Sequence, residues 1–190
     1  MNTEKIILDN IKYRRSIFPV SYIDQDIPDE IIKELLTYAN YAPSHKLTQP
    51  WFFTVFNGEG RSALADKMAE LYRAQTNEEQ FLQKKYDNIK EKILKSAAIV
   101  AINIAYSGIV PEWEEVAAIG CAAQNLWLAA RAKGIGGYWS TPGTLSGLKD
   151  FLQLGRNEAC LGLFYLGYHH EKETTGLRKP IDEKIRWIKS

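Results

Sequence analysis

The spacing of apolar residues predicts a helix at the start of the chain and a second one soon after it. Apolar side chains at Ile6, Ile7, Ile11 and Tyr13 recur at helical spacing, and Pro19 lies beyond the end of that helix. The second helix is expected to open at residue 28 and to end before residue 43, because proline disfavours a helical conformation in the residue that precedes it. Its apolar face carries Ile31, Ile32, Leu35, Leu36 and Ala39.

Two apolar runs in the middle of the chain are typical of buried strands. Residues 51–56 are rich in aromatic and β-branched side chains and are followed by an Asn-Gly-Glu-Gly turn. Residues 97–105 are nearly all apolar, as expected of a central strand that is covered on both faces. Periodicity predicts helices over residues 61–73 and 77–95, and we expect the Lys and Glu residues of the second of these to face solvent.

The longest predicted helix spans residues 111–133 and has a stripe of small residues near its middle. Small side chains allow another backbone to come close. The stripe fits ordinary core packing and an interface across a two-fold axis equally well, so both interpretations stay open. It consists of Ala117, Ala118, Gly120, Cys121, Ala122 and Ala123.

The last third of the chain is predicted to hold two more strands. A short strand over residues 137–141 follows a glycine-rich break, and a second strand is expected over residues 160–168. Between them the pattern predicts a short amphipathic helix around residues 145–152, and a polar loop fills residues 169–180. With 190 residues, of which 45% are hydrophobic, the chain is expected to form one domain over residues 1–190.

Composition excludes several classes of partner. The 24 basic and 23 acidic residues give a net charge of +1, so no global field gathers nucleic acid or anionic membrane. No segment has the length of a secretory signal or a spanning helix. The 2 cysteines, Cys121 and Cys160, offer neither a disulfide framework nor metal-ligand spacing, and we expect both to be small buried hydrophobes. A cytoplasmic location is therefore expected, and no metal site.

Arg14, Arg15 and Ser16 form a candidate anion site where the first helix ends. Two guanidinium groups and a hydroxyl within three residues suit a phosphate group. The alternative is that each arginine makes a separate salt bridge at the surface. A second basic cluster, Arg178-Lys179, precedes Pro180 and could complete the site, although spacing alone does not bring the two clusters together.

The loop over residues 43–50 is a second candidate site. It places His45, Lys46 and Gln49 between Pro43 and Pro50, and a loop confined by prolines is rigid. Such a loop can direct side chains at the edge of a flat heterocycle, such as the pyrimidine edge of a flavin. Lys46, or a backbone N–H of the loop, would then stabilise the negative charge of the reduced ring.

The glycines at 134, 136 and 137 do not form a dinucleotide-binding motif. They follow a helix and open a strand, whereas the Rossmann motif requires a strand, then glycines, then a helix. We interpret them as allowing the backbone to approach a flat ligand, with Trp139, Ser140 and Thr141 directly behind. A plain helix C-cap at Gly134 is the alternative, and it explains only one of the three.

Taken together, these segments resemble the nitroreductase family. The chain carries, in the family's order, an Arg-Arg-Ser helix exit, a proline-bounded loop ending in Gln-Pro-Trp, a glycine break before a short strand, and a late Arg-Lys-Pro. His45-Lys46 beside Pro43-Ser44, and the short chain, are most similar to the small bacterial YdjA-like subgroup. The resemblance implies an α+β fold, in which helices flank a central, mostly antiparallel sheet.

The resemblance also implies a homodimer that binds two FMN molecules at the subunit interface. Residues 184–189 would form a strand that crosses to the partner's sheet, and the small-residue stripe would be the dimer seam. Arg14, Arg15, Ser16 and Arg178 are assigned to the FMN phosphate and ribityl chain. The other implied cofactor contacts are Tyr41, Pro43, His45, Lys46 and Gln49 from one subunit, and Gly136, Gly137, Trp139, Ser140 and Thr141 from the other part of the site.

One position departs from the family's pattern. Many relatives have an asparagine two residues before the Gln of the loop, where it bonds the flavin pyrimidine, and this chain has Leu47. That hydrogen bond cannot be carried over, and His45 or Lys46 could replace it.

The expected activity is electron transfer from NADH or NADPH, bound near residues 132–137, through flavin N5 to a small acceptor such as a nitroaromatic or a quinone, with ping-pong kinetics. We expect no protein residue to act as a covalent nucleophile or as a dedicated acid, because the flavin performs the chemistry. One alternative is a protein that binds a flavin or a phosphometabolite without redox turnover. Another is an interaction module without a ligand.

Overall fold

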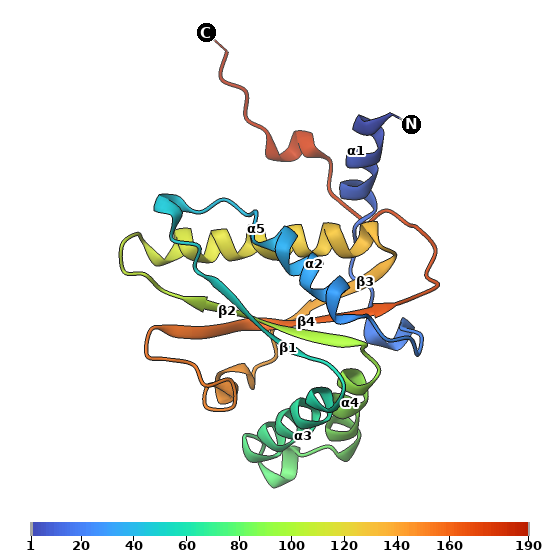
Figure 1. The fold of residues 1–190 in the computed structure, drawn as a ribbon, viewed down its shortest axis with the longest axis vertical. Helices are drawn as coiled ribbons and strands as arrows, with labels where there is room; N and C mark the ends of the chain where they lie inside the picture. The colour runs from blue at the N-terminus through green and yellow to red at the C-terminus, as the bar shows by residue number, and fades with distance from the viewer. Residues whose placement is uncertain (1, 190) are drawn as a thin grey trace.

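Alternating side chains along the two central strands build a core on both faces of the sheet. The computed structural model describes residues 2–189 and contains a four-stranded sheet in the order β1-β2-β4-β3 (Figure 1). The strands are β1 (Trp51–Phe56), β2 (Ala98–Ala105), β3 (Ile135–Ser140) and β4 (Glu158–Tyr168), and every pairing is antiparallel. The α+β class with a mostly antiparallel central sheet is therefore confirmed.

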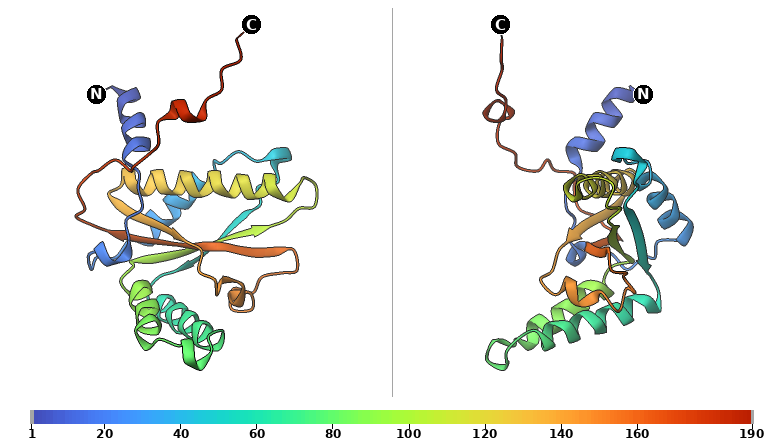
Figure 2. Two further views of the ribbon diagram at one scale, coloured as in Figure 1. Left: turned by 180° about the vertical axis from the view of Figure 1, so that it is seen from behind. Right: turned by 90° about the vertical axis from the view of Figure 1, so that its left-hand side faces the viewer.

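Helices form a layer on each side of this sheet (Figures 1 and 2). Val100 and Ile102 of β2 point to one face and pack with α2 (Asp29–Ala39) and α5 (Glu112–Ala132). Ile99 and Ala101 point to the other face, where α3 (Glu59–Ala74) and α4 (Gln83–Leu94) cover them. The two-residue period of the strand explains why β2 is apolar throughout.

Four predicted elements differ from those observed, one of them the strand expected over residues 160–168, which begins at Glu158. The helix expected over residues 77–95 begins only at Gln83, because the Leu82 N–H donates to the Tyr72 hydroxyl (3.1 Å) and the Phe81 ring stacks on Tyr72. The helix expected over residues 145–152 is a single 3₁₀ turn, Leu145–Leu148. The strand expected from residue 137 begins earlier, at residue 135.

Both ends of the chain project from the body (Figure 2). Helix α1 (Thr3–Tyr13) has no buried residue, and its apolar Ile6, Ile7 and Ile11 are about half exposed. After a 3₁₀ turn at Ile181–Lys184, residues 185–189 have no regular structure in the single chain, and Trp187 and Ile188 are exposed. The exchange of this segment with a partner stays a prediction.

The small-residue stripe of α5 is divided between two environments. Ala118, Ala122 and Ala123 are buried against the sheet, which confirms core packing for that half. Cys121 is exposed on the opposite side of the helix, so the expectation of a buried thiol there is wrong. No helix within residues 2–189 has the length and apolar content that crossing a membrane requires.

Gly136 and Gly137 make room for the chain's own side chains. A Cβ at Gly137 would lie 2.7 Å from the Phe164 ring and 2.9 Å from Trp127 Nε1. A Cβ at Gly136 would lie 2.9 Å from both Ile17 and His169. Close packing within the subunit therefore requires these glycines, and their contact with a flat ligand stays a prediction.

Replacing Gly137 with Ala tests this packing. The added methyl group has no free space, so we expect the free energy of unfolding to fall by about 1–3 kcal/mol. Urea unfolding measures the change. Gly143→Ala is the matched control, because nothing lies within 4 Å of a Cβ there. Equal stability of the two variants would contradict the packing argument.

Candidate functional site

The segment after α1 lies along the outer edge of β3. The Ile17 N–H donates to the Gly137 carbonyl (3.0 Å), and the Phe18 ring packs on Tyr138 with centroids 4.6 Å apart. Two segments that the sequence singled out separately, the Arg-Arg-Ser exit and the glycine strand, are thus neighbours. Ser16 is half-buried at this junction.

The two adjacent arginines have different surroundings. Arg15 donates to Glu171 Oε2 (3.0 Å) and to the Lys172 carbonyl (3.2 Å), which agrees with the surface salt-bridge interpretation. Arg14 has no carboxylate within ion-pair distance among residues 2–189, and its guanidinium stacks on the Trp127 ring at 4.4 Å. Arg14 is therefore the arginine that is free to bind an anion.

Arg178 approaches Arg14 from the other end of the chain. Burial, and then the positive charge of Arg178, lower the pKa of the Arg14 guanidinium. Two like charges at a partly buried position repel each other, and an anion bound between them would offset that repulsion. The structure thus brings together the two basic clusters that sequence spacing could not connect.

Lys92 of α4 is a site residue that the sequence analysis missed. Its ammonium lies 4.5 Å from the Tyr138 ring centroid and 4.3 Å from that of Tyr165, and it donates to Ser140 Oγ (3.3 Å). Burial lowers the pKa of Lys92 from 10.5 to about 8. The signal was available: Lys92 lies three residues after Ile89 and therefore on the inner face of the helix, not on its solvated face.

A pocket of about 390 Å³ opens beside Lys92. Phe18, Pro19, Val20 and Tyr138 form its apolar walls, and α4 supplies its polar groups. Glu91 and Lys95, which pair with each other, also line the pocket, and Lys92 has no ion-pair partner among the described residues. Aromatic walls beside such an ammonium suit a flat ring that carries an electron-rich edge.

The three predicted cofactor contacts at the end of β3, Trp139, Ser140 and Thr141, do not lie in one place. Ser140 is on the Lys92 side of the sheet, whereas Trp139 packs in the opposite core, where its indole N–H is buried without a partner. Thr141 is exposed beyond the end of the strand. Among these three predicted cofactor contacts, only Ser140 lies beside the pocket.

The loop with His45 lies at the other end of the α5 layer. His45 Nδ1 is 2.5 Å from Glu114 Oε2, in the first turn of α5. Lys46, Leu47 and Gln49 have φ angles of 51°, 56° and 43°, in the left-handed region that side chains other than those of Gly and Asn rarely adopt. The loop is exposed in the single chain, as are Tyr41 and Pro43 before it.

Leu47 takes a backbone conformation that asparagine adopts readily. Its φ of 56° lies in the left-handed region, which asparagine tolerates better than leucine does, and its side chain is 81% exposed. Leu47 therefore adopts this conformation although its side chain is not buried within the subunit.

One chain does not bring its two groups of candidate residues together. Glu114, which holds the His45 loop, and Trp127, which holds Arg14, are separated by about 20 Å along α5 at the rise of an α-helix. Within residues 2–189 no group of three His, Cys, Asp or Glu side chains is arranged to hold a metal ion.

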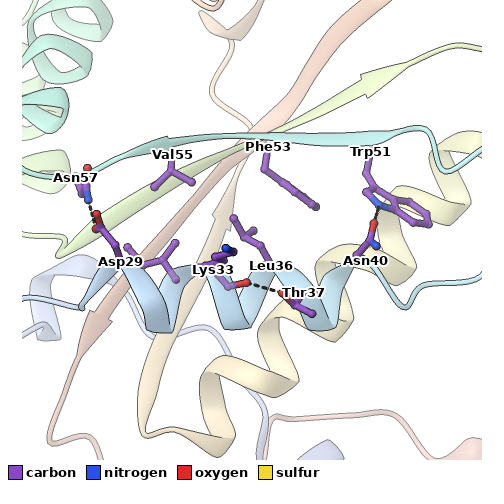
Figure 3. A pocket seen from close by; sticks show the side chains of 10 residues that line it. Asp29, Lys33, Leu36, Thr37, Asn40, Trp51, Phe53, Val55 and Asn57 are labelled. Carbon is purple, nitrogen blue, oxygen red and sulfur yellow. Dashed lines mark hydrogen bonds between the residues drawn. The ribbon is translucent and has the colours of Figure 1, made fainter.

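A groove of about 560 Å³ runs between α2 and the edge strand β1 (Figure 3). Leu36, Phe53 and Val55 line its middle, while hydrogen bonds from Asn57 to Asp29 (2.5 Å) and from Trp51 to Asn40 (2.9 Å) mark its ends. None of the predicted site residues lines it. Strand β1 pairs only with β2, so its outer edge is unpaired within the described chain.

Burial of Lys92 makes a prediction about stability and pH. Since the pKa is about 8 in the folded chain and 10.5 for a free lysine, the unfolded chain binds more protons between these values, and stability rises with pH there. Below pH 8 both states are charged and the full penalty of burial is present. The free energy of unfolding of Lys92→Met, relative to that of the wild type, should therefore be higher at pH 7 than at pH 10.

Urea unfolding of both proteins at the two pH values measures the difference. A stability difference between Lys92→Met and wild type that is the same at pH 7 and pH 10 would show that Lys92 titrates like a solvated lysine.

Comparison with known proteins agrees with this architecture. The chain is 26% identical over 190 residues to YfhC of Bacillus subtilis (strain 168), covering 97% of this chain and 95% of that protein. It is 26% identical over 155 residues to YdjA of Escherichia coli (strain K12), covering 80% and 82%. The names of both assign them as NAD(P)H nitroreductases, which confirms the expected likeness to YdjA.

Solved structures share the fold over the whole chain. A nitroreductase-like family protein from Bacillus cereus superposes with a TM-score of 0.86 at 27% identity, covering 100% of both chains. A protein from Desulfovibrio desulfuricans, assigned as a nitroreductase and solved in complex with FMN, gives 0.73 at 24% identity, covering 96% of each. Residues 11–168 match the sequence model of the Nitroreductase family. This chain belongs to the nitroreductase family.

Proposed function

We propose that the chain is an FMN-dependent NAD(P)H oxidoreductase that works as a homodimer. The single observation that carries the proposal is the partly buried Arg14, which has no carboxylate partner among the described residues and feels the like charge of Arg178. The family membership and the names of YdjA and YfhC support the redox activity.

The phosphate of FMN fits the Arg14 group. Its charge would relieve the repulsion between Arg14 and Arg178, and the guanidinium forks can bond its oxygens in pairs. The Ser16 hydroxyl lies two residues from Arg14 and could add a further bond. Arg15 contributes less, because Glu171 already neutralises it.

The flavin ring fits the pocket between Phe18, Tyr138 and Lys92. FMN, when bound, would take a hydride at N5 from the nicotinamide donor and then pass it to an acceptor, which gives ping-pong kinetics. Lys92 would stabilise the negative charge that collects at the N1–O2 edge on reduction. It is better placed for this role than Lys46, whose side chain is exposed on the distant loop.

A second copy of the chain would complete the site. The partner's residues 43–49 would cover the flavin, because one chain holds that loop far from its own arginines. Exposed apolar side chains at both ends of the chain and Val116 of α5 support an interface of this kind. The partner's residues 185–188 suit the groove beside β1, where a fifth strand would pair the free edge.

The acceptor and the donor are proposed at the level of chemical class. The names of the relatives support NADH or NADPH as donor, and nitroaromatics or quinones are the acceptors to test first. A cytoplasmic location stays a prediction. Metal-ion and nucleic-acid partners form no part of the proposal.

The proposal is tested by the colour and the redox behaviour of the purified protein. We expect a yellow protein that NADH or NADPH bleaches in the absence of oxygen and that a quinone or a nitroaromatic restores. A yellow protein that neither donor bleaches would support the alternative, a flavin-binding protein without turnover. A protein that neither contains nor takes up FMN would overturn the proposal.

Variants of the two arginines sharpen the same experiment. Arg14→Ala should weaken FMN binding about 10- to 100-fold, the loss expected for charged hydrogen bonds to an anion. Arg15→Ala, the matched control, should weaken it less, because its guanidinium is paired with Glu171. Equal losses would show that the phosphate does not select Arg14.

A further inference from the structure

His45 and Glu114 form a pair whose geometry is costly to maintain. Three residues of the loop that carries His45 have left-handed backbone angles, each of which costs about 1–3 kcal/mol for a residue other than glycine. Strain of this kind persists where the surrounding structure holds it, and it clusters at functional sites. Here the contact between His45 Nδ1 and Glu114 Oε2 is one of the bonds that hold the loop to α5.

Glu114 determines which nitrogen of His45 is available. A carboxylate accepts but does not donate, so it keeps a proton on Nδ1 and leaves Nε2 directed away from α5. Glu114 lies in the first turn of α5, where the helix dipole favours a negative charge. The neighbouring Glu115 is turned inward and accepts from the Ser107 backbone N–H at 3.1 Å and 3.2 Å, so it does not compete.

The surroundings of the pair change when a partner covers them. Leu47 and Trp113, which are close to the pair in sequence, are 81% and 70% exposed in the single chain. Large apolar side chains are left this open where another surface packs on them. In the proposed function this loop covers the partner's flavin, and such cover would exclude water from His45.

We propose that His45, oriented by Glu114, donates the proton that the acceptor needs in addition to the hydride. The inference rests on the proposed function and adds a residue role to it. A quinone takes up one hydride and one proton to become a hydroquinone, and a nitro group takes up the same pair to become a nitroso group and water. The reacting form of His45 carries a proton on each ring nitrogen: the Nε2 proton passes to the acceptor, the Nδ1 proton stays on Nδ1 and is donated in a hydrogen bond to Glu114, and solvent then returns a proton to Nε2.

His45 thus acts on the acceptor, and Glu114 is a positioning residue. Lys46 is the nearest alternative in sequence, but its side chain is exposed, and no side-chain hydrogen bond or ion pair fixes it among residues 2–189. Lys92 is enclosed by two tyrosine rings and already donates to Ser140. Tyr41 has no polar contact that orients its hydroxyl among residues 2–189.

The test separates proton transfer from electron transfer. FMN-loaded wild type and His45→Gln are reduced with NADPH, or with NADH, and then mixed rapidly with 1,4-benzoquinone or with ferricyanide, which accepts electrons without a proton. We expect His45→Gln to slow reoxidation by the quinone about 100-fold, the lower end of the effect of a general acid. Reduction by the donor and reoxidation by ferricyanide should be unchanged.

Glu114→Gln is compared with Glu112→Gln, which removes a charge from the same turn of α5 at an exposed position. Only Glu114→Gln should slow the quinone step, by about 10-fold. In the protein without substrate, nitrogen-15 NMR of its 3 histidines should show neutral His45 protonated at Nδ1 in the wild type and shifted toward the Nε2 tautomer in Glu114→Ala, which leaves Nδ1 without its acceptor. A purely structural role of Glu114 would leave the tautomer unchanged.

The outcomes distinguish the inference from the function on which it rests. If the donor never reduces the flavin, the proposed oxidoreductase activity fails, whatever His45 does. If the donor reduces it normally and His45→Gln reoxidises as fast as the wild type with the quinone, the proton-donor role is wrong. Equal slowing with quinone and ferricyanide also overturns it, since His45 would then only position the flavin or the loop.

Discussion

The candidate site depends on the close packing that two glycines allow at the edge of the sheet. With no side chain at Gly137, Trp127 of α5 reaches the strand, and its ring carries the Arg14 guanidinium. With no side chain at Gly136, Ile17 lies against β3, which places Phe18 on Tyr138 beside Lys92. Strand β3 thus positions both the Arg14 group, on the α5 face, and the Lys92 pocket, on the α4 face.

The same packing leaves the site incomplete within one chain. The loop with the left-handed residues is anchored to the first turn of α5, and the arginine group lies beside its fifth turn. Helix α1, the end of the chain and the edge of β1 all lack the contacts that apolar side chains and strand edges normally make. A second copy that supplies these contacts would also supply the missing loop, which is why we link dimer formation to cofactor binding.

The sequence predicted most of the fold, because periodicity reports burial directly. β2 is apolar throughout since both faces are covered, and its pattern placed it correctly at the centre of the sheet. The helix expected from residue 77 started late because contacts with Tyr72, which are tertiary, replaced helical bonds. Short elements such as residues 145–152 failed for the same reason.

The candidate site was less predictable, because the type of a residue does not reveal which side chains it contacts in the fold. Arg14 and Arg15 are identical in sequence terms, and only the position of Glu171 separates them. Lys92 was grouped with solvated lysines although its spacing placed it inward. Gly136 and Gly137 were singled out correctly as positions without room for a side chain, but the neighbours that exclude one are protein atoms.

The claim that two chains share each site is tested most directly with hybrid dimers. Arg14→Ala chains are paired with chains in which residues 45–49 are replaced by glycine and serine, and NAD(P)H-dependent quinone reduction is measured at limiting FMN. Both parental homodimers should be nearly inactive, while each hybrid should regain one intact site and measurable activity. Hybrids no more active than the parents would show that each chain builds its site alone, and that would contradict the account.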